Sequence, residues 1–275
     1  MSRVDVVITG GNSGVGEATA AALALAGHHV LIGCRSMDKA RRAAGRMVGD
    51  VDVRHLDLAD LASVRAFADF VDRVDVLINN AGVFALPLSR TADGFEAHMG
   101  INHLGHFALT CLLAERITGR VISVGSAMYR RGVIHLDDLN CYRRRYSRRR
   151  AYSDSKLAVM LFIAELARRG VRAYASDPGL ALTDITRDGP ALLRWLGRPT
   201  RARGLTSHPA AAGAASTLMA VTTDQPSGTY FAPWMFSLYG RQRAVAVRDK
   251  GRDPATARAL WELSAELTGC DWPSS

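Results

Sequence analysis

Short apolar runs alternate with helix-like segments through most of this chain of 275 residues. The runs at 4–8, 30–33 and 74–79 are mostly apolar and rich in β-branched side chains, which is typical of strands buried on both faces. Parallel strands need a long crossover between them, and a helix-like segment such as 15–26 supplies one. The alternation therefore predicts an α/β fold in three layers, a doubly wound parallel sheet covered by helices on both faces. Further strands are predicted at 51–56, 120–124 and 172–176, and further helices at 38–47, 61–71, 94–113, 152–169 and 255–267.

The sequence shows no internal repeat and no linker-like segment. Its length suits one large α/β domain, and a hydrophobic content of 48% is enough to fill a substantial core. We therefore expect a single domain over residues 1–275.

A glycine-rich turn joins the first predicted strand to the first predicted helix. Glycines allow the backbone to turn tightly and to approach a pyrophosphate, and the helix N-terminus adds free N–H groups and the positive end of a dipole. The turn therefore predicts a dinucleotide site in a Rossmann-type fold, with an ordinary strand-to-helix turn as the alternative. The residues expected to hold the cofactor here are Gly10, Asn12, Ser13, Gly14, Val15 and Gly16.

The end of the second predicted strand indicates which dinucleotide binds. Enzymes that use NAD usually place an acidic residue there to hold the ribose 2′-hydroxyl. This sequence has no carboxylate at that position and carries Arg35 instead. A guanidinium matches a 2′-phosphate in charge and geometry, so NADP(H) is the predicted cofactor.

Tyr152 and Lys156 stand four residues apart in a predicted helix, so their side chains share one face. A free tyrosine has a pKa of about 10. A cation about 4 Å away, at an effective dielectric constant near 20, contributes roughly 4 kcal/mol, or some three pKa units before desolvation opposes it. We therefore expect Lys156 to lower the pKa of Tyr152 and Tyr152 to act as a general acid/base. The spacing alone is common, and a surface pair is the alternative.

The turn has the spacing T-G-x-x-x-G-x-G, and with Tyr152 and Lys156 it resembles the short-chain dehydrogenase/reductase family along nearly the whole chain. Segments 93–107, 142–166 and 260–269 resemble the retinol-dehydrogenase-like branch most. The resemblance implies an oxidoreductase that moves a hydride between NADP(H) and a small carbonyl or alcohol substrate, with reduction as the expected direction.

The same resemblance implies roles for other residues. Ser126 is expected to hydrogen-bond the substrate oxygen, and Asn102 to support a water-linked proton path to Lys156. Asp177 stands where relatives often have histidine. Further residues expected to hold the cofactor are Asp57, Leu58, Asn80, Ala81, Gly82, Pro178, Gly179 and Thr183, together with Tyr152 and Lys156.

The family's substrate lid follows Thr183, so we expect a lid at about 183–210. Apolar residues there, Trp195 among them, and a second apolar stretch at 230–236 are suited to close over an apolar or aromatic ligand. Core or subunit packing is the alternative for the second stretch. We therefore expect a small apolar or aromatic ketone or aldehyde, of the kind found in natural-product biosynthesis.

The net charge of +9 raises the question of nucleic acid. Only three of the 35 basic residues are lysine, which fits arginine-rich codon usage, and the arginines clustered in 143–150 are interpreted as a solvated loop. A nucleic-acid groove is the alternative, and no nucleic-acid partner is predicted.

Other patterns bear on location and metal binding. No apolar run approaches the roughly 18 residues of a membrane span, and neither a signal peptide nor the N-terminal anchor of membrane-bound relatives is present. We therefore expect a cytoplasmic protein with no membrane partner. The four cysteines lack metal or redox spacing and are expected to be free thiols. His98, His103 and His106 do not share one helix face, so no metal site is predicted.

Besides the nucleic-acid groove, two alternative functions remain open at this point. The same fold could serve a redox-neutral reaction such as epimerisation, dehydration or rearrangement. It could also serve a non-catalytic protein that senses NADP. A monomer, dimer or tetramer is compatible with the sequence.

Overall fold

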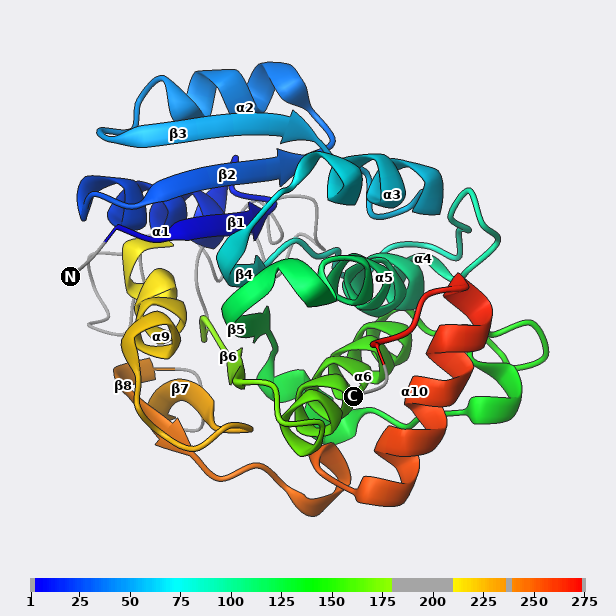
Figure 1. Ribbon diagram of the computed structural model, residues 1–275. Coiled ribbons are helices and arrows are strands. Elements are labelled where there is room, and N and C mark those ends of the chain that lie inside the picture. The colour runs from blue at the N-terminus through cyan, green and yellow to red at the C-terminus, as the bar shows by residue number, and fades with distance from the viewer. Residues whose placement is uncertain (1–2, 180–209, 236–238, 274–275) are drawn as a thin grey trace, which may run out of the picture.

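The computed structural model describes residues 3–179, 210–235 and 239–273 (Figure 1). Eight strands form one sheet in the order β3-β2-β1-β4-β5-β6-β7-β8. Every neighbouring pair is parallel except β7 and β8, which are antiparallel. The predicted parallel α/β fold is therefore confirmed. The strands are β1 (Asp5–Thr9), β2 (His29–Cys34), β3 (Asp50–His55), β4 (Val74–Asn79), β5 (Ile117–Val124), β6 (Ala173–Ser176), β7 (Tyr230–Met235) and β8 (Tyr239–Val245).

Helices cover both faces of the sheet, as Figure 1 shows. Because side chains alternate along a strand, β1 feeds two cores: Val6 and Ile8 pack on one face, and Val7 packs on the other. The first core includes residues of α1, α2 and α9, and the second includes residues of α3, α5, α6 and α10. The helices are α1 (Gly14–Leu25), α2 (Met37–Ala44), α3 (Leu61–Phe70), α4 (Ala97–Met99), α5 (Gly105–Leu112), α6 (Arg148–Arg168), α9 (Ala210–Thr222) and α10 (Pro254–Thr268).

The strand order positions the functional site. The chain runs from β1 outward to β2 and β3, and then returns to β4 on the other side of β1. The connections after β1 and β4 therefore leave the sheet in opposite directions, which opens a crevice beyond the carboxyl ends of these two strands. The glycine-rich turn follows β1 and enters this crevice.

The helix predicted at 94–113 is wrong in its start and in its continuity. Glu96 caps α4 by accepting hydrogen bonds from the backbone N–H groups of His98 and Met99, so the helix begins at Ala97. Between α4 and α5 the backbone forms a π-helical turn, Gly100–Leu104. Such wide turns within α-helices are frequent at functional sites.

The helix predicted at 152–169 begins earlier than expected, at Arg148. Arg148, Arg149 and Arg150 therefore lie on the first turn of α6, and the solvated-loop interpretation of the arginine cluster is wrong for them. Arg144 is also structured, because it pairs with Asp138 at 3.2 Å and with Asp154 at 3.5 Å.

The C-terminal third contains both a confirmed prediction and missed elements. The helix predicted at 255–267 is confirmed as α10; Asp253 caps it, and Gly269 ends it in the left-handed conformation with φ 62°. Helix α9 and strand β8 were not predicted. The apolar stretch at 230–236 contributes β7, whose Tyr230 and Phe231 are buried, so core packing is the correct interpretation for these side chains. The predicted lid and Thr183 lie outside the described residues, apart from Ala210 at the start of α9.

Candidate functional site

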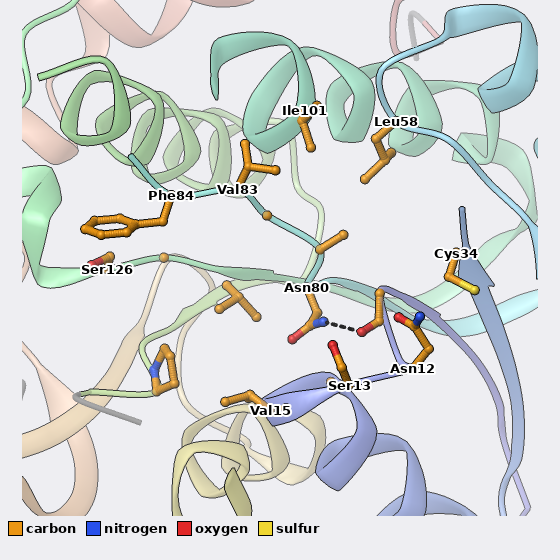
Figure 2. A pocket seen from close by; sticks show the side chains of 18 of the residues that line it. Asn12, Ser13, Val15, Cys34, Leu58, Asn80, Val83, Phe84, Ile101 and Ser126 are labelled. Atoms are coloured by element: carbon orange, nitrogen blue, oxygen red, sulfur yellow. Dashed lines mark hydrogen bonds between the residues drawn. The ribbon is translucent and has the colours of Figure 1, made fainter. Parts of the chain in front are cut away.

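A cavity of about 660 Å³ lies beyond the carboxyl ends of the central strands. Figure 2 shows Phe84 and Ser126 on one side of it and Cys34 and Asn12 on the other. It brings together most of the predicted site residues. Those that line it are Gly10, Asn12, Ser13, Gly14, Val15, Gly16, Arg35, Asp57, Leu58, Asn80, Ala81, Gly82, Ser126, Tyr152, Pro178 and Gly179.

Two positions in the turn require glycine. Gly10 has φ +67°, and a Cβ there would lie 3.0 Å from the Cα of Ala81. A Cβ on Gly16 would lie 2.4 Å from both the carbonyl oxygen of Gly10 and the Nδ2 of Asn80. Asn80 in turn donates from Nδ2 to the carbonyl oxygen of Thr9 at 2.8 Å. Gly10 therefore packs closely against the backbone at Ala81, and the Asn80 side chain fills the space beside Gly16, so neither glycine position has room for a side chain of its own.

The N-terminus of α1 opens into the same cavity. The helix begins at Gly14, and the side chain of its N-cap, Ser13, makes no capping hydrogen bond. The first N–H groups of a helix lack partners within it, so those of Gly14, Val15 and Gly16 are suited to bind an anion. The close glycine packing and the free N–H groups fit the pyrophosphate of a dinucleotide.

Two basic side chains line the cavity past the end of β2. Arg35 is exposed and forms no ion pair with any residue that the structure describes. Lys39, on α2, lines the same region and was not predicted. A search for a second base one helical turn beyond Arg35 would have found it. Together the two cations fit a phosphate on the adenosine ribose.

Thr9, at the end of β1, organises the floor of the site. Its Oγ1 accepts hydrogen bonds from the backbone N–H groups of Asn80 and Ala81, both at 2.9 Å. Both lone pairs of the hydroxyl are then used, so its hydrogen is donated to Nε2 of His106, 2.8 Å away. Nδ1 of His106 therefore carries the ring hydrogen and donates it to the carbonyl oxygen of Asn102 at 3.2 Å. Burial lowers the pKa of His106 to about 4, so the ring is neutral near pH 7.

Asn102 lies in the π-helical turn and joins two parts of the site. Its Oδ1 accepts from the backbone N–H of Val83 at 2.8 Å, and its Nδ2 donates to the carbonyl oxygen of Val83 at 3.1 Å. Nδ2 also donates to the Oγ of Ser155 on α6 at 2.9 Å. Asn102 thereby fixes the segment after β4 relative to the helix that carries Tyr152 and Lys156.

Tyr152 and Ser126 meet at the catalytic end of the cavity. The Ser126 hydroxyl lies close enough to the phenol of Tyr152 to lower its pKa. The ring of Phe84 packs edge-on against Tyr152, with ring centroids 4.7 Å apart. Lys156 is buried behind them, and its Nζ donates to the carbonyl oxygen of Val124 at 2.7 Å. Its Nζ is 5.8 Å from the centroid of the Tyr152 ring.

The expected lowering of the Tyr152 pKa is wrong for this structure. Burial raises the pKa of Tyr152 to about 12, the negative charge of Asp177 adds to the rise, and the Ser126 hydroxyl opposes it. Burial also lowers the pKa of Lys156 to about 8, against the effect of Asp177. Desolvation therefore outweighs the attraction of the lysine. Tyr152 holds its proton near pH 7 and is equipped to act as an acid.

Asp177 supplies a buried carboxylate beneath the catalytic end. Tyr230 donates its hydroxyl hydrogen to Oδ2 at 2.6 Å, and the backbone N–H of Gly179 donates to Oδ1 at 2.8 Å. Burial raises the pKa of Asp177, while these hydrogen bonds lower it. Asp177 and Lys156 act on each other's pKa, so each partly offsets the other's charge.

The cysteines, the clustered histidines and the helix lengths lie outside the cavity and bear on the predictions about thiols, metals and membranes. All four cysteines are free and buried, as expected. Among the described residues, no group of three potential metal ligands converges on one point. His103 instead hydrogen-bonds Ser264 at 2.8 Å. Over the same described ranges, no helix combines the length and apolarity of a membrane span.

Known proteins resemble this chain over nearly its full length. A sequence profile of the family described as short chain dehydrogenase matches residues 5–191. Retinol dehydrogenase 13 of Homo sapiens is 39% identical, covering 98% of this chain and 86% of its own. Retinol dehydrogenase 12 of Homo sapiens is 41% identical, covering 97% and 87%. The crystal structure of an uncharacterized protein from Mycobacterium paratuberculosis has a TM-score of 0.87 and 43% identity, covering 99% of this chain and 96% of that one. This chain therefore belongs to the short-chain dehydrogenase family, in its retinol-dehydrogenase-like branch.

Proposed function

We propose that this protein is an NADP(H)-dependent reductase that converts a small aldehyde or ketone with an apolar or aromatic body into an alcohol. One observation carries the proposal. A single cavity contains the phosphate-binding turn and two cations at one end, and Ser126 with Tyr152 at the other. Members of this oxidoreductase family use nicotinamide cofactors, and the relatives named above are called retinol dehydrogenases, whose named substrate is an apolar alcohol.

The preference for NADP(H) rests on Arg35 and Lys39. No carboxylate stands at the end of β2 to receive a ribose hydroxyl, and the two cations there favour a phosphate. The turn would hold the pyrophosphate through the N-terminus of α1. Asp57 and Leu58 would border the adenine, and Asn80, Ala81 and Gly82 the adenosine ribose.

Bound NADPH would supply the hydride to the carbonyl carbon of the substrate. Tyr152 would donate its phenolic proton to the oxygen that becomes the hydroxyl, and Ser126 would donate a hydrogen bond to that oxygen. Lys156 would hold the nicotinamide ribose and stabilise the phenolate left behind, and Asn102 would support the path that returns a proton. Tyr152 holds its proton near pH 7 and can therefore donate it in this step.

Phe84 and Met128 line the cavity beside Ser126 and Tyr152 and provide apolar walls there. These walls suit an apolar or aromatic substrate, of the kind found in natural-product biosynthesis. We place this reaction in the cytoplasm.

A panel of aliphatic and aromatic aldehydes, assayed with NADPH and with NADH, tests the proposal. We expect consumption of one NADPH for each alcohol formed, and a higher kcat/KM with NADPH than with NADH. A product formed without net NADPH oxidation would instead support a redox-neutral reaction. Tight NADPH binding with no conversion of any carbonyl compound in the panel would support a sensing role.

A further inference from the structure

The catalytic end of the cavity carries two arginines that hydride transfer does not require. Arg131 and Arg149 line the same cavity as Ser126 and Tyr152. Within the described part of the chain, neither guanidinium forms an ion pair or a side-chain hydrogen bond. By contrast, Arg143 and Arg144 nearby are paired with Asp137 and Asp138. Both side chains are exposed, so each guanidinium is open to an acidic group of a bound molecule.

The backbone fixes the position of Arg131. It ends the 3₁₀ helix η3 (Ala127–Arg131), which begins directly after Ser126. A Cβ on Gly132 would lie 2.3 Å from the carbonyl oxygen of Ser153, so η3 is pressed against α6 at this point. The backbone N–H of Val133 donates to Oδ1 of Asp154 at 2.8 Å. Arg131 is therefore held beside the first turns of α6 and does not lie on a free loop.

Arg149 reaches the cleft from α6 itself. It stands three residues before Tyr152, so the two side chains lie on the same face of the helix. The Oγ of Ser153 donates to the carbonyl oxygen of Arg149 at 2.9 Å, within the regular helix. The two arginines thus line the cavity from different elements, η3 and α6.

No described carboxylate that lines the cavity pairs with Arg131 or Arg149. Among the residues that the structure describes, the carboxylates that line the cavity are Asp57 and Asp177. Asp57 follows β3, at the end of the cavity assigned above to adenine, and its Oδ1 accepts from the backbone N–H of Ala59 at 3.0 Å. Asp177 is buried, holds Tyr230 and Gly179, and faces Lys156. Arg35 and Lys39 lie with Asp57 and cannot account for charge beside Tyr152.

We propose that the substrate carries an acidic group, a carboxylate or a phosphate, which Arg131 and Arg149 bind while its carbonyl faces Ser126 and Tyr152. This inference rests on the proposed function and adds the substrate class. Guanidinium groups suit both acids, because their paired N–H groups match two oxygens. Phe84 and Met128 line the same end, so an aromatic or apolar body joins the carbonyl to the acid. A purely apolar substrate such as a retinoid would leave both guanidiniums without a partner.

The test uses three aldehydes with one aromatic frame: 4-formylbenzoate, its methyl ester and 4-formylphenyl phosphate. With NADPH, we expect kcat/KM for at least one of the two acids to exceed that for the ester by about tenfold, the effect of a charge-assisted hydrogen-bonded pair. The better acid identifies the group. Its advantage is expected to fall as salt is added, because exposed charges are screened. Arg131→Gln and Arg149→Gln should each reduce the ratio, and the double variant should bring it close to one. Arg258→Gln, an exposed arginine on α10, is the matched control and should leave the ratio unchanged.

A binding measurement separates the two proposals. Calorimetric titration of the NADP⁺-saturated protein with benzoate, phenyl phosphate and benzamide requires no turnover. Tighter binding of an acid than of benzamide, lost in the double arginine variant, supports the inference. Equal binding of all three, or reduction of the ester as fast as of both acids, overturns it and leaves the reductase proposal intact. Acid binding without reduction of any aldehyde overturns the reductase proposal instead.

Discussion

Replacing His106 by leucine removes two buried hydrogen bonds while keeping a side chain of similar bulk. In the native protein, Thr9 donates to Nε2 of His106, and Nδ1 of His106 donates to the carbonyl oxygen of Asn102. The variant leaves a buried hydroxyl hydrogen and a buried carbonyl oxygen without these partners. Each unsatisfied group costs about 1–3 kcal/mol. Because a leucine recovers some apolar packing, we expect the free energy of unfolding to fall by about 2–3 kcal/mol.

The same change is expected to weaken cofactor binding. The Thr9 hydroxyl holds the backbone N–H groups of Asn80 and Ala81, and it is oriented by His106. Urea unfolding at neutral pH measures the loss of stability, and fluorescence titration measures the NADPH dissociation constant. We expect that constant to rise several-fold.

His103→Leu is the matched control. His103 is also buried and hydrogen-bonds Ser264 on α10, outside the cofactor cavity. This control should lose stability and keep native affinity for NADPH. If His106→Leu unfolded at the native urea concentration, or bound NADPH as tightly as the native protein does, the proposed network would be refuted.

Two further predictions concern charge. Arg35→Asp should weaken NADPH binding by tenfold or more and NADH binding little, since the guanidinium is expected to contact only the extra phosphate; dissociation constants for both nucleotides check it, and Lys39→Gln should shift them in the same direction by less. Equal weakening of both nucleotides would contradict the assignment. Stability should also fall as pH drops from about 6.5 towards 4, because unfolded histidine takes up a proton near pH 6.5 whereas burial holds the folded pKa of His106 at about 4. His106 therefore takes up a proton in the unfolded protein but not in the folded protein over this pH range, which lowers the free energy of unfolding by roughly 3 kcal/mol. His103, with a folded pKa of about 3, acts in the same direction. Urea unfolding across this pH range measures the slope, and a slope that is the same in His106→Leu would argue against the buried neutral ring.

Local sequence signals predicted the centre of the fold. The strands β1, β2 and β4 are short apolar runs, and the ends of α10 carry an aspartate cap and a glycine stop. The π-helical turn was missed because its glycines pack against residues that lie outside the segment. A Cβ on Gly105 would lie 2.5 Å from the carbonyl oxygen of Leu58, and one on Gly100 would lie 2.5 Å from Thr91. No periodicity argument within the segment contains that information.

The sheet edge was missed for a different reason. Pro233 interrupts β7, where the pairing register shifts, and β8 is rich in polar and charged side chains. Both features count against a strand in propensity arguments. In the fold, β8 is the edge strand and tolerates polar residues, whereas Pro233 lies in β7, past the residues that pair with β6 and next to the register shift.

The residues of the candidate site also fall into those that local motifs predict and those that they do not. The glycine turn and the Tyr152–Lys156 pair are local motifs, and the sequence predicted them directly. Lys39 and Arg149 stand one helical turn from Arg35 and Tyr152, so their spacing was available in the sequence. His106 and Arg131 enter the site through long-range packing, which no local spacing reports. The Tyr152 pKa was predicted in the wrong direction because a helix spacing reports the nearby cation and does not report burial or Asp177.

In the proposed reaction, the phenol of Tyr152 protonates the substrate oxygen. The most direct measurement is single-turnover oxidation of bound NADPH by an accepted aldehyde in Tyr152→Phe, followed by cofactor absorbance. We predict native affinity for NADPH, unchanged thermal unfolding within a few degrees, and a rate lower by a hundredfold or more, about the contribution of a general acid. A rate close to that of the native protein would contradict the account.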